Sequence, residues 1–142
     1  MPTITVPARM ENLGSTMEYL KKQVPDEFAA QATNVQLVAE ELLVNVFSYA
    51  YPRGSEGEAE LKLETEMLDG EEKLVFEVRD WGKPFNPFEE APVPDITASL
   101  EDRPLGGLGI YLIKQVSEKQ SWSYKENANC IRIIFGRMPL SH

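Results

Sequence analysis

The 142-residue sequence contains a single cysteine and a single histidine. With Cys130 alone, neither an internal disulfide nor a metal site built from several cysteines can form. The histidine, His142, is the last residue, which excludes a histidine-containing catalytic triad, a histidine metal site and an internal phosphoacceptor histidine. Cys130 lies in the alternating run ANCIRIIF, and we expect it to be a buried thiol on a strand.

Long apolar runs and basic charge are also scarce. No stretch approaches the roughly 18 apolar residues of a membrane-spanning helix, and the N-terminus lacks the basic and apolar segments of a signal peptide. With 14 basic and 23 acidic residues, the net charge of −9 repels nucleic acid and anionic lipid. We therefore expect one cytoplasmic domain over residues 1–142 that binds neither nucleic acid nor membrane.

The sequence contains a readable succession of strands and helices. Two alternating runs flank Asp69-Gly70, a dipeptide typical of a tight hairpin. Residues 82–105 carry five prolines, which favours an extended loop over a helix. The pattern predicts an α+β two-layer sandwich, with a mostly antiparallel mixed sheet and helices on one face. The expected strands are 3–8, 59–68, 72–80, 120–126 and 130–136, and the expected helices are 11–24, 28–50 and 107–119.

One polar pair lies on the expected second helix. Glu41 and Asn45 are four residues apart, so their side chains share a helix face, from which Glu40 diverges. A carboxamide oxygen can ligate Mg²⁺ and a neighbouring carboxylate can accept a proton, a combination that suits a phosphate site. Taken alone, the pair is better explained as a solvated polar stripe.

Two further segments contain glycine beside polar groups. Asp80 ends a strand and could accept a hydrogen bond from an exocyclic amine, with Gly82 leaving room for a flat base; an ordinary turn is the alternative. The run Gly106-Gly107-Leu108-Gly109 opens a helix, where bare N–H groups and the helix dipole favour phosphate. A simple loop-to-helix turn would also account for those glycines.

The three segments together, in this order, resemble the ATP-binding boxes of the GHKL ATPases, which share the Bergerat or histidine-kinase-like ATPase fold. Asp80-x-Gly82-x-Pro84-Phe85 and the short chain are most similar to the anti-sigma factor serine/threonine kinases. The resemblance implies that Glu41 is the general base, that Asn45 holds Mg²⁺ and that Asp80 binds the adenine amino group. It implies an ATP lid at about residues 86–105. The implied ATP-binding residues are Asn45, Asp80, Gly82, Pro84, Arg103, Gly106, Gly107, Leu108 and Gly109.

For function, the resemblance implies an ATP- and Mg²⁺-dependent kinase that phosphorylates an anti-anti-sigma (STAS-type) protein and sequesters a sigma factor, thereby regulating transcription. A homodimer formed through the first helix stays open, as does a solvated position for Arg103. The alternative is a nucleotide-gated binding module without phosphate transfer, although Glu41 beside Asn45 favours the kinase. A histidine kinase fragment is disfavoured because no internal histidine is present.

One departure from the family pattern lies before the last strand. Many members carry a Gly-Thr pair there, whereas this chain has Asn127-Ala128-Asn129-Cys130. Asn129 could supply a polar contact to the adenine pocket in place of the threonine. We expect five aromatic residues to form core and pocket wall: Phe47, Tyr49, Tyr51, Trp81 and Phe85.

Overall fold

A five-stranded sheet forms one layer of the computed structural model, which describes residues 3–52, 54–90 and 107–140. Its strand order is β1-β2-β3-β5-β4, and each neighbouring pair is antiparallel. The strands are β1 (Ile4–Pro7), β2 (Glu58–Leu68), β3 (Glu71–Asp80), β4 (Lys119–Lys125) and β5 (Ala128–Phe135).

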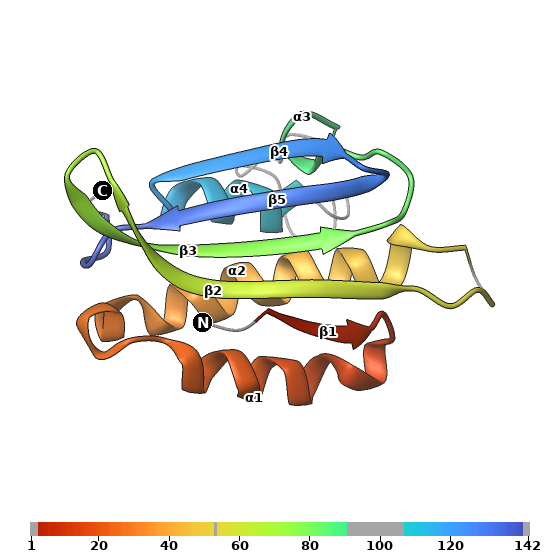
Figure 1. Cartoon of the computed structure of the whole chain (residues 1–142), viewed down its shortest axis with the longest axis horizontal. Coiled ribbons are helices and arrows are strands. Elements are labelled where there is room, and N and C mark those ends of the chain that lie inside the picture. The colour runs from red at the N-terminus through yellow and green to blue at the C-terminus, as the bar shows by residue number, and fades with distance from the viewer. Residues whose placement is uncertain (1–2, 53, 91–106, 141–142) are drawn as a thin grey trace, which may run out of the picture.

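Helices form the second layer, on one face of the sheet (Figure 1). The central helix α2 contacts α1 on one side and α4 on the other. The helical segments are η1 (Met10–Asn12), α1 (Leu13–Gln23), η2 (Asp26–Gln31), α2 (Ala32–Asn45), η3 (Val46–Ala50), α3 (Pro87–Glu90) and α4 (Gly107–Val116). Among the described residues, no helix is both long and apolar enough to cross a bilayer.

The core lies between α2 and the sheet. Val35, Val38 and Leu42 recur at helical spacing and are fully buried, facing inward-pointing residues of the strands. Each fully buried apolar side chain contributes about 1.5–3 kcal/mol, so this layer is the main stabilising element and fixes α2 against the sheet. The inward-pointing residues of the central strands include Leu61, Leu63, Phe76, Val78, Ile131 and Ile133.

The predicted fold class is confirmed, including the hairpin between β2 and β3. Asp69 and Gly70 have φ values of 51° and 83°, the left-handed pair that a two-residue hairpin turn requires. The helix expected over 28–50 is instead three segments: the 3₁₀ segment η2, α2 and the π-helical η3. The last expected helix ends at Val116 rather than at 119, because β4 already begins at Lys119.

Two predictions about burial need correction. Cys130 is only partly buried; its neighbours Asn129 and Ile131 are buried, so it faces the side of the sheet away from the helices. Tyr49 is 80% exposed and so belongs to neither core nor pocket wall, and Trp81 and Phe85 are also substantially exposed. Tyr49 lies in the π-helical segment η3, of whose residues only Val46 is buried.

The face of the sheet away from the helices carries an ion-pair cluster centred on Arg132 of β5. Its guanidinium donates two hydrogen bonds to Glu66 of β2, at 2.6 and 2.8 Å, and one to Glu77 of β3, at 2.8 Å. These charge-assisted bonds lower the pKa of Glu66. The cluster therefore ties β5 to the β2–β3 hairpin, which lies more than 45 residues earlier in the chain.

Candidate functional site

Helices α2 and α4 bring the first and third predicted segments together. A Cβ placed on Gly109 of α4 would collide with the carboxylate of Glu41 of α2. The Glu41 side chain thus occupies the space that any larger residue at position 109 would need. Gly107 and Leu108 begin α4, whereas Gly106, Arg103 and most of the predicted lid (residues 91–105) lie outside the described residues.

The two polar residues on α2, Glu41 and Asn45, are both partly buried. Burial, and to a smaller extent the charge of Glu40, raise the pKa of Glu41 above its ordinary value of 4.5. Within the described part of the chain, neither Glu41 nor Asn45 has a hydrogen-bond partner for its side chain. Both groups are therefore available to a ligand.

Asp80 ends β3 and is 6% exposed. Its Oδ1 accepts hydrogen bonds from the backbone N–H of Gly82, at 2.9 Å, and from Nδ2 of Asn129, at 3.1 Å. Oδ2 has no partner among the described residues. Burial raises the pKa of Asp80, and the two hydrogen bonds partly offset that shift.

Gly82 lies against the end of the helical segment that follows Asn45. A Cβ at this position would collide with the carbonyl oxygen of Ala50, the last residue of η3. Because the obstacle is backbone, the contact requires glycine even without a ligand. Sequence reasoning gave Gly82 a role toward a base, which stays a prediction, and missed this packing role.

Asn129 holds the loop that follows Asp80. Its Nδ2 donates to the carbonyl of Lys83 at 2.8 Å, and its Oδ1 accepts from the backbone N–H of Phe85 at 2.9 Å. Pro84 is fixed between these two anchored residues. Asn129 itself is buried on β5, opposite Asp80 in the strand register. The sequence marked Asn129 as a polar position but did not indicate that its partners are protein groups.

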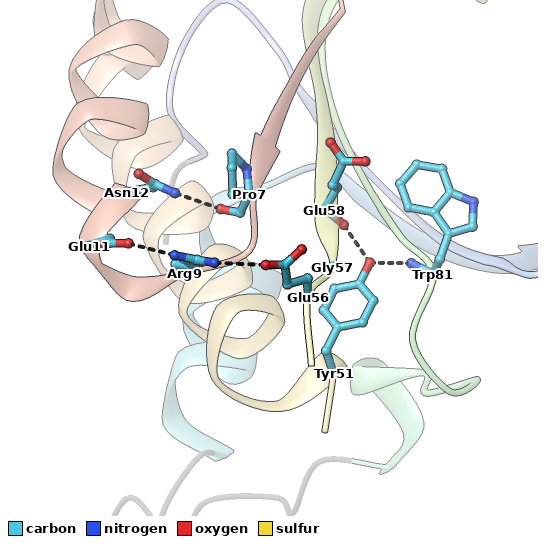
Figure 2. A pocket seen from close by; sticks show the side chains of 9 residues that line it. All are labelled: Pro7, Arg9, Glu11, Asn12, Tyr51, Glu56, Gly57, Glu58 and Trp81. Atoms are coloured by element: carbon cyan, nitrogen blue, oxygen red, sulfur yellow. Dashed lines mark hydrogen bonds and ion pairs between the residues drawn. The ribbon is translucent and has the colours of Figure 1, made fainter. Parts of the chain in front are cut away.

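Tyr51, predicted only as core or pocket wall, makes two hydrogen bonds to backbone groups close to Asp80. Its hydroxyl accepts the backbone N–H of Trp81, at 2.9 Å, and donates to the carbonyl of Glu58, at 2.5 Å (Figure 2). It therefore joins the start of β2 to the end of β3, directly beside Asp80. No local pattern could have revealed it, because one of its two partners is 30 residues away.

A groove of about 720 Å³ is lined in part by Tyr51 (Figure 2). None of the predicted site residues lines it, although Trp81 follows Asp80 directly. Within it, Arg9 pairs with Glu11 and Glu56 through exposed side chains. The lining residues are Pro7, Arg9, Glu11, Asn12, Tyr51, Glu56, Gly57, Glu58 and Trp81.

Comparison with known proteins identifies the same kind of domain along most of the chain. The family model described as "histidine kinase-like ATPase domain" matches residues 6–135. A solved histidine kinase domain, from a blue-light activated histidine kinase of Erythrobacter litoralis, is similar at 18% identity with a TM-score of 0.49. That similarity covers 88% of this chain and 59% of the other. No curated protein matches the chain.

Proposed function

The chain belongs to the histidine kinase-like ATPase domain family, and we propose that it binds ATP with Mg²⁺ and transfers the γ-phosphate to a serine or threonine of a protein partner. The observation that most directly supports this proposal is the position of two contacts along α2 and η3. Glu41 lies against the start of α4, and Ala50, nine residues later, lies against Gly82. The two contacts are nine residues apart on one continuous helical segment, so they mark separate positions along it, as the phosphate and base ends of a nucleotide require.

The described residues fit this ligand at both ends. The unpartnered Oδ2 of the buried Asp80 can accept a hydrogen bond from the adenine amino group. The start of α4 would face the phosphates; contacts from Gly106 and Arg103, which lie outside the described residues, stay predictions. At the base end, Gly82 and Pro84 belong to the loop held by Asn129.

Magnesium would be held mainly by the nucleotide. Among the described residues, no group of three or more histidine, cysteine, aspartate and glutamate side chains could bind a metal ion. Asn45 alone, with phosphate oxygens and water, matches the way Mg²⁺ commonly binds in nucleotide sites. When bound, the ion would neutralise phosphate charge.

Glu41 would take the proton from the attacking hydroxyl. A carboxylate is a more effective general base when its pKa approaches the working pH, and burial raises the pKa of Glu41 in that direction. A module that only binds ATP needs no such base, which favours phosphate transfer over a nucleotide-gated binding module. Lack of an internal histidine in the sequence favours a hydroxyl acceptor on another protein.

The finer proposal is an anti-sigma factor serine/threonine kinase that acts in the cytoplasm. Its support is the Asp80-x-Gly82-x-Pro84-Phe85 form of the second box. The partners would be an anti-anti-sigma (STAS-type) protein as phosphoacceptor and a sigma factor as the sequestered protein. The net charge of −9 suits a partner with basic patches.

The proposal is tested by calorimetric titration with ATP and ADP, with and without Mg²⁺, of the parent protein and of Asp80→Asn. Mg²⁺-dependent binding that the variant loses supports the site. Phosphate transfer from γ-labelled ATP to a STAS-type protein, absent with Glu41→Gln, supports the kinase. Tight ATP binding with no transfer to any STAS-type protein would favour the binding module, and no binding at all would refute the site.

A further inference from the structure

The side-chain amide of Asn129 is fully committed to protein groups. Oδ1 accepts from the backbone N–H of Phe85 and from Nε1 of Trp122, each at 2.9 Å. Nδ2 donates to Oδ1 of Asp80, at 3.1 Å, and to the carbonyl of Lys83, at 2.8 Å. An asparagine amide has two strong acceptor directions and two N–H donors, so these four bonds use its whole capacity; a longer contact of 3.5 Å from Nδ2 to the carbonyl of Gly82 shares one of the same N–H groups.

The four partners also fix which way the amide points. Two of them, Phe85 and Trp122, can only donate, and the Lys83 carbonyl can only accept. Rotating the amide by 180° would place donor against donor and acceptor against acceptor at three of the four positions. The network therefore allows one orientation, in which an N–H always faces Asp80.

This geometry gives the two carboxylate oxygens of Asp80 different roles. Oδ1 is occupied by Asn129 and by the N–H of Gly82, which leaves Oδ2 to meet a ligand. An ionised carboxylate oxygen only accepts hydrogen bonds, so it matches the 6-amino group of adenine and repels the 6-oxo group of guanine. A protonated Asp80 could instead donate to the 6-oxo group of guanine.

We propose that Asn129 is a positioning residue for purine selection: by holding Asp80 ionised and in one orientation, it makes the pocket prefer adenine over guanine. The inference rests on the proposed function, because it deepens the assignment of the same nucleotide site. It also gives Asn129 a role through Asp80 and not through direct contact with the base, since no hydrogen-bonding capacity remains for a ligand.

Few neighbouring groups can change the ionisation of Asp80, and Asn129 is the one that a substitution can test most directly. Among the described residues, Tyr51, which directly follows η3, is a titratable group whose charge interacts with that of Asp80. Burial raises the pKa of Tyr51 above its ordinary value of 10.0, so it stays neutral between pH 5 and pH 8. Changes in Asp80 ionisation over that range therefore report on position 129.

The test measures ATP and GTP binding with Mg²⁺ from pH 5 to pH 8 for the parent, Asn129→Ser, Asn129→Asp and Trp122→Phe. In the parent, we expect ATP preference to hold at pH 8. Asn129→Ser, whose hydroxyl is too short to reach all partners, should reduce the ATP-to-GTP preference at least tenfold. Trp122→Phe removes one of the four orienting bonds but keeps the bond between Asn129 and Asp80 and the bonds to Phe85 and Lys83, so it should change the preference less than Asn129→Ser does.

Asn129→Asp gives the sharpest signature. It places a second carboxylate against Oδ1 of Asp80, and such a pair retains a shared proton to unusually high pH. ATP binding should then be strongest at acidic pH, where the new group is protonated and can donate to Asp80, and should be lost towards pH 8. The direction of the pH dependence is thus reversed relative to the parent, which a purely structural defect would not produce.

A measurement without nucleotide separates this inference from the proposed function. The carboxyl ¹³C signal of Asp80 should titrate at higher pH in Asn129→Ser than in the parent, because a bond to the ionised form is lost. If the parent binds ATP but both position-129 variants keep its preference and pH profile, the positioning role is wrong. If the ¹³C titration moves as expected and no protein binds nucleotide, the proposed function is wrong while the control of Asp80 by Asn129 is supported.

Discussion

The carbonyl oxygen of Ala50 faces Gly82 so closely that a side chain at position 82 would strike the backbone. Gly82→Ala is therefore expected to lower the free energy of unfolding by about 1–3 kcal/mol without any nucleotide, as overpacking usually does. Urea unfolding measures the change. Gly14→Ala is the control, because a Cβ there meets nothing within 4 Å. Equal stability of Gly82→Ala and the parent would show that the contact is loose.

Asp80 is expected to cost the protein stability at neutral pH. Its pKa is raised by burial above the ordinary 3.8, so stability from this group is full below that value and is lost as pH rises through the folded pKa. Asp80→Asn cannot titrate and should be at least as stable as the parent at pH 7. ATP affinity should nevertheless fall about ten- to a hundredfold, the effect of losing a charged hydrogen bond.

Thermal melting of both proteins from pH 4 to pH 8 checks the stability side, and calorimetry checks affinity. A melting temperature for Asp80→Asn that falls with pH as the parent's does would assign the pH dependence to another group. Lower stability of the variant at every pH would mean that the carboxylate is a net stabilising group despite its burial.

Glu40 is expected to tune Glu41 without taking part in the reaction. Its charge contributes to the raised pKa of Glu41, so Glu40→Gln should lower that pKa. The acid limb of ATP turnover, which requires an ionised base, should then move to lower pH with the plateau rate nearly unchanged. Glu41→Gln should lower the rate about 10²- to 10⁴-fold at every pH.

Initial rates of ADP release across pH, with and without a phosphoacceptor, distinguish these two variants. An acid limb that does not move in Glu40→Gln would show that Glu41 is not the group reported by the profile. Full activity of Glu41→Gln would remove it from the reaction.

Arg132→Ala is expected to destabilise the sheet by about 1–3 kcal/mol, the size of hydrogen bonds to charged groups. Arg132 and Glu66 are 28% and 27% exposed at the side chain, whereas Arg9 and Glu56 are 57% and 88% exposed. Arg9→Ala should therefore change stability by less than about 1 kcal/mol. Urea unfolding of both variants, with Glu66→Ala completing a double-mutant cycle, measures the difference.

The same cluster predicts sensitivity to acid. Because Arg132 lowers the pKa of Glu66 below 4.5, the stabilisation is present at neutral pH and is lost as pH falls through the lowered value. The parent should lose more stability than Arg132→Ala between pH 5 and pH 2. Parallel stability curves for the two proteins would contradict this.

Much of the fold could be read from local patterns. The two-residue turn at Asp69-Gly70 carries its own signal, and alternation along β2 and β3 reflects one buried face. The shared face of Glu41 and Asn45 also follows directly from helix geometry. Each of these features depends on residues within a few positions of one another. Such residues are also close in space, so the local sequence is enough to predict how they are arranged.

The remaining features depend on contacts that the sequence order conceals. Asn129 lies 49 residues from Asp80 and is brought opposite it only by the pairing of β3 with β5. Tyr51 reaches Trp81 because η3 departs from the α-helical period before the chain turns into β2. The groove beside Tyr51 depends in turn on where β1, β2 and β3 end relative to one another. Such contacts leave no periodic trace.

Because Glu41 lies against Gly109, the basicity of its carboxylate depends on how α4 packs against α2. Burial raises the pKa of Glu41, and part of the cover is the backbone of another helix. Were α4 to move away from α2, water would reach the carboxylate and its proton affinity would fall. Reactivity at position 41 would then report, from one side chain, whether two helices are docked.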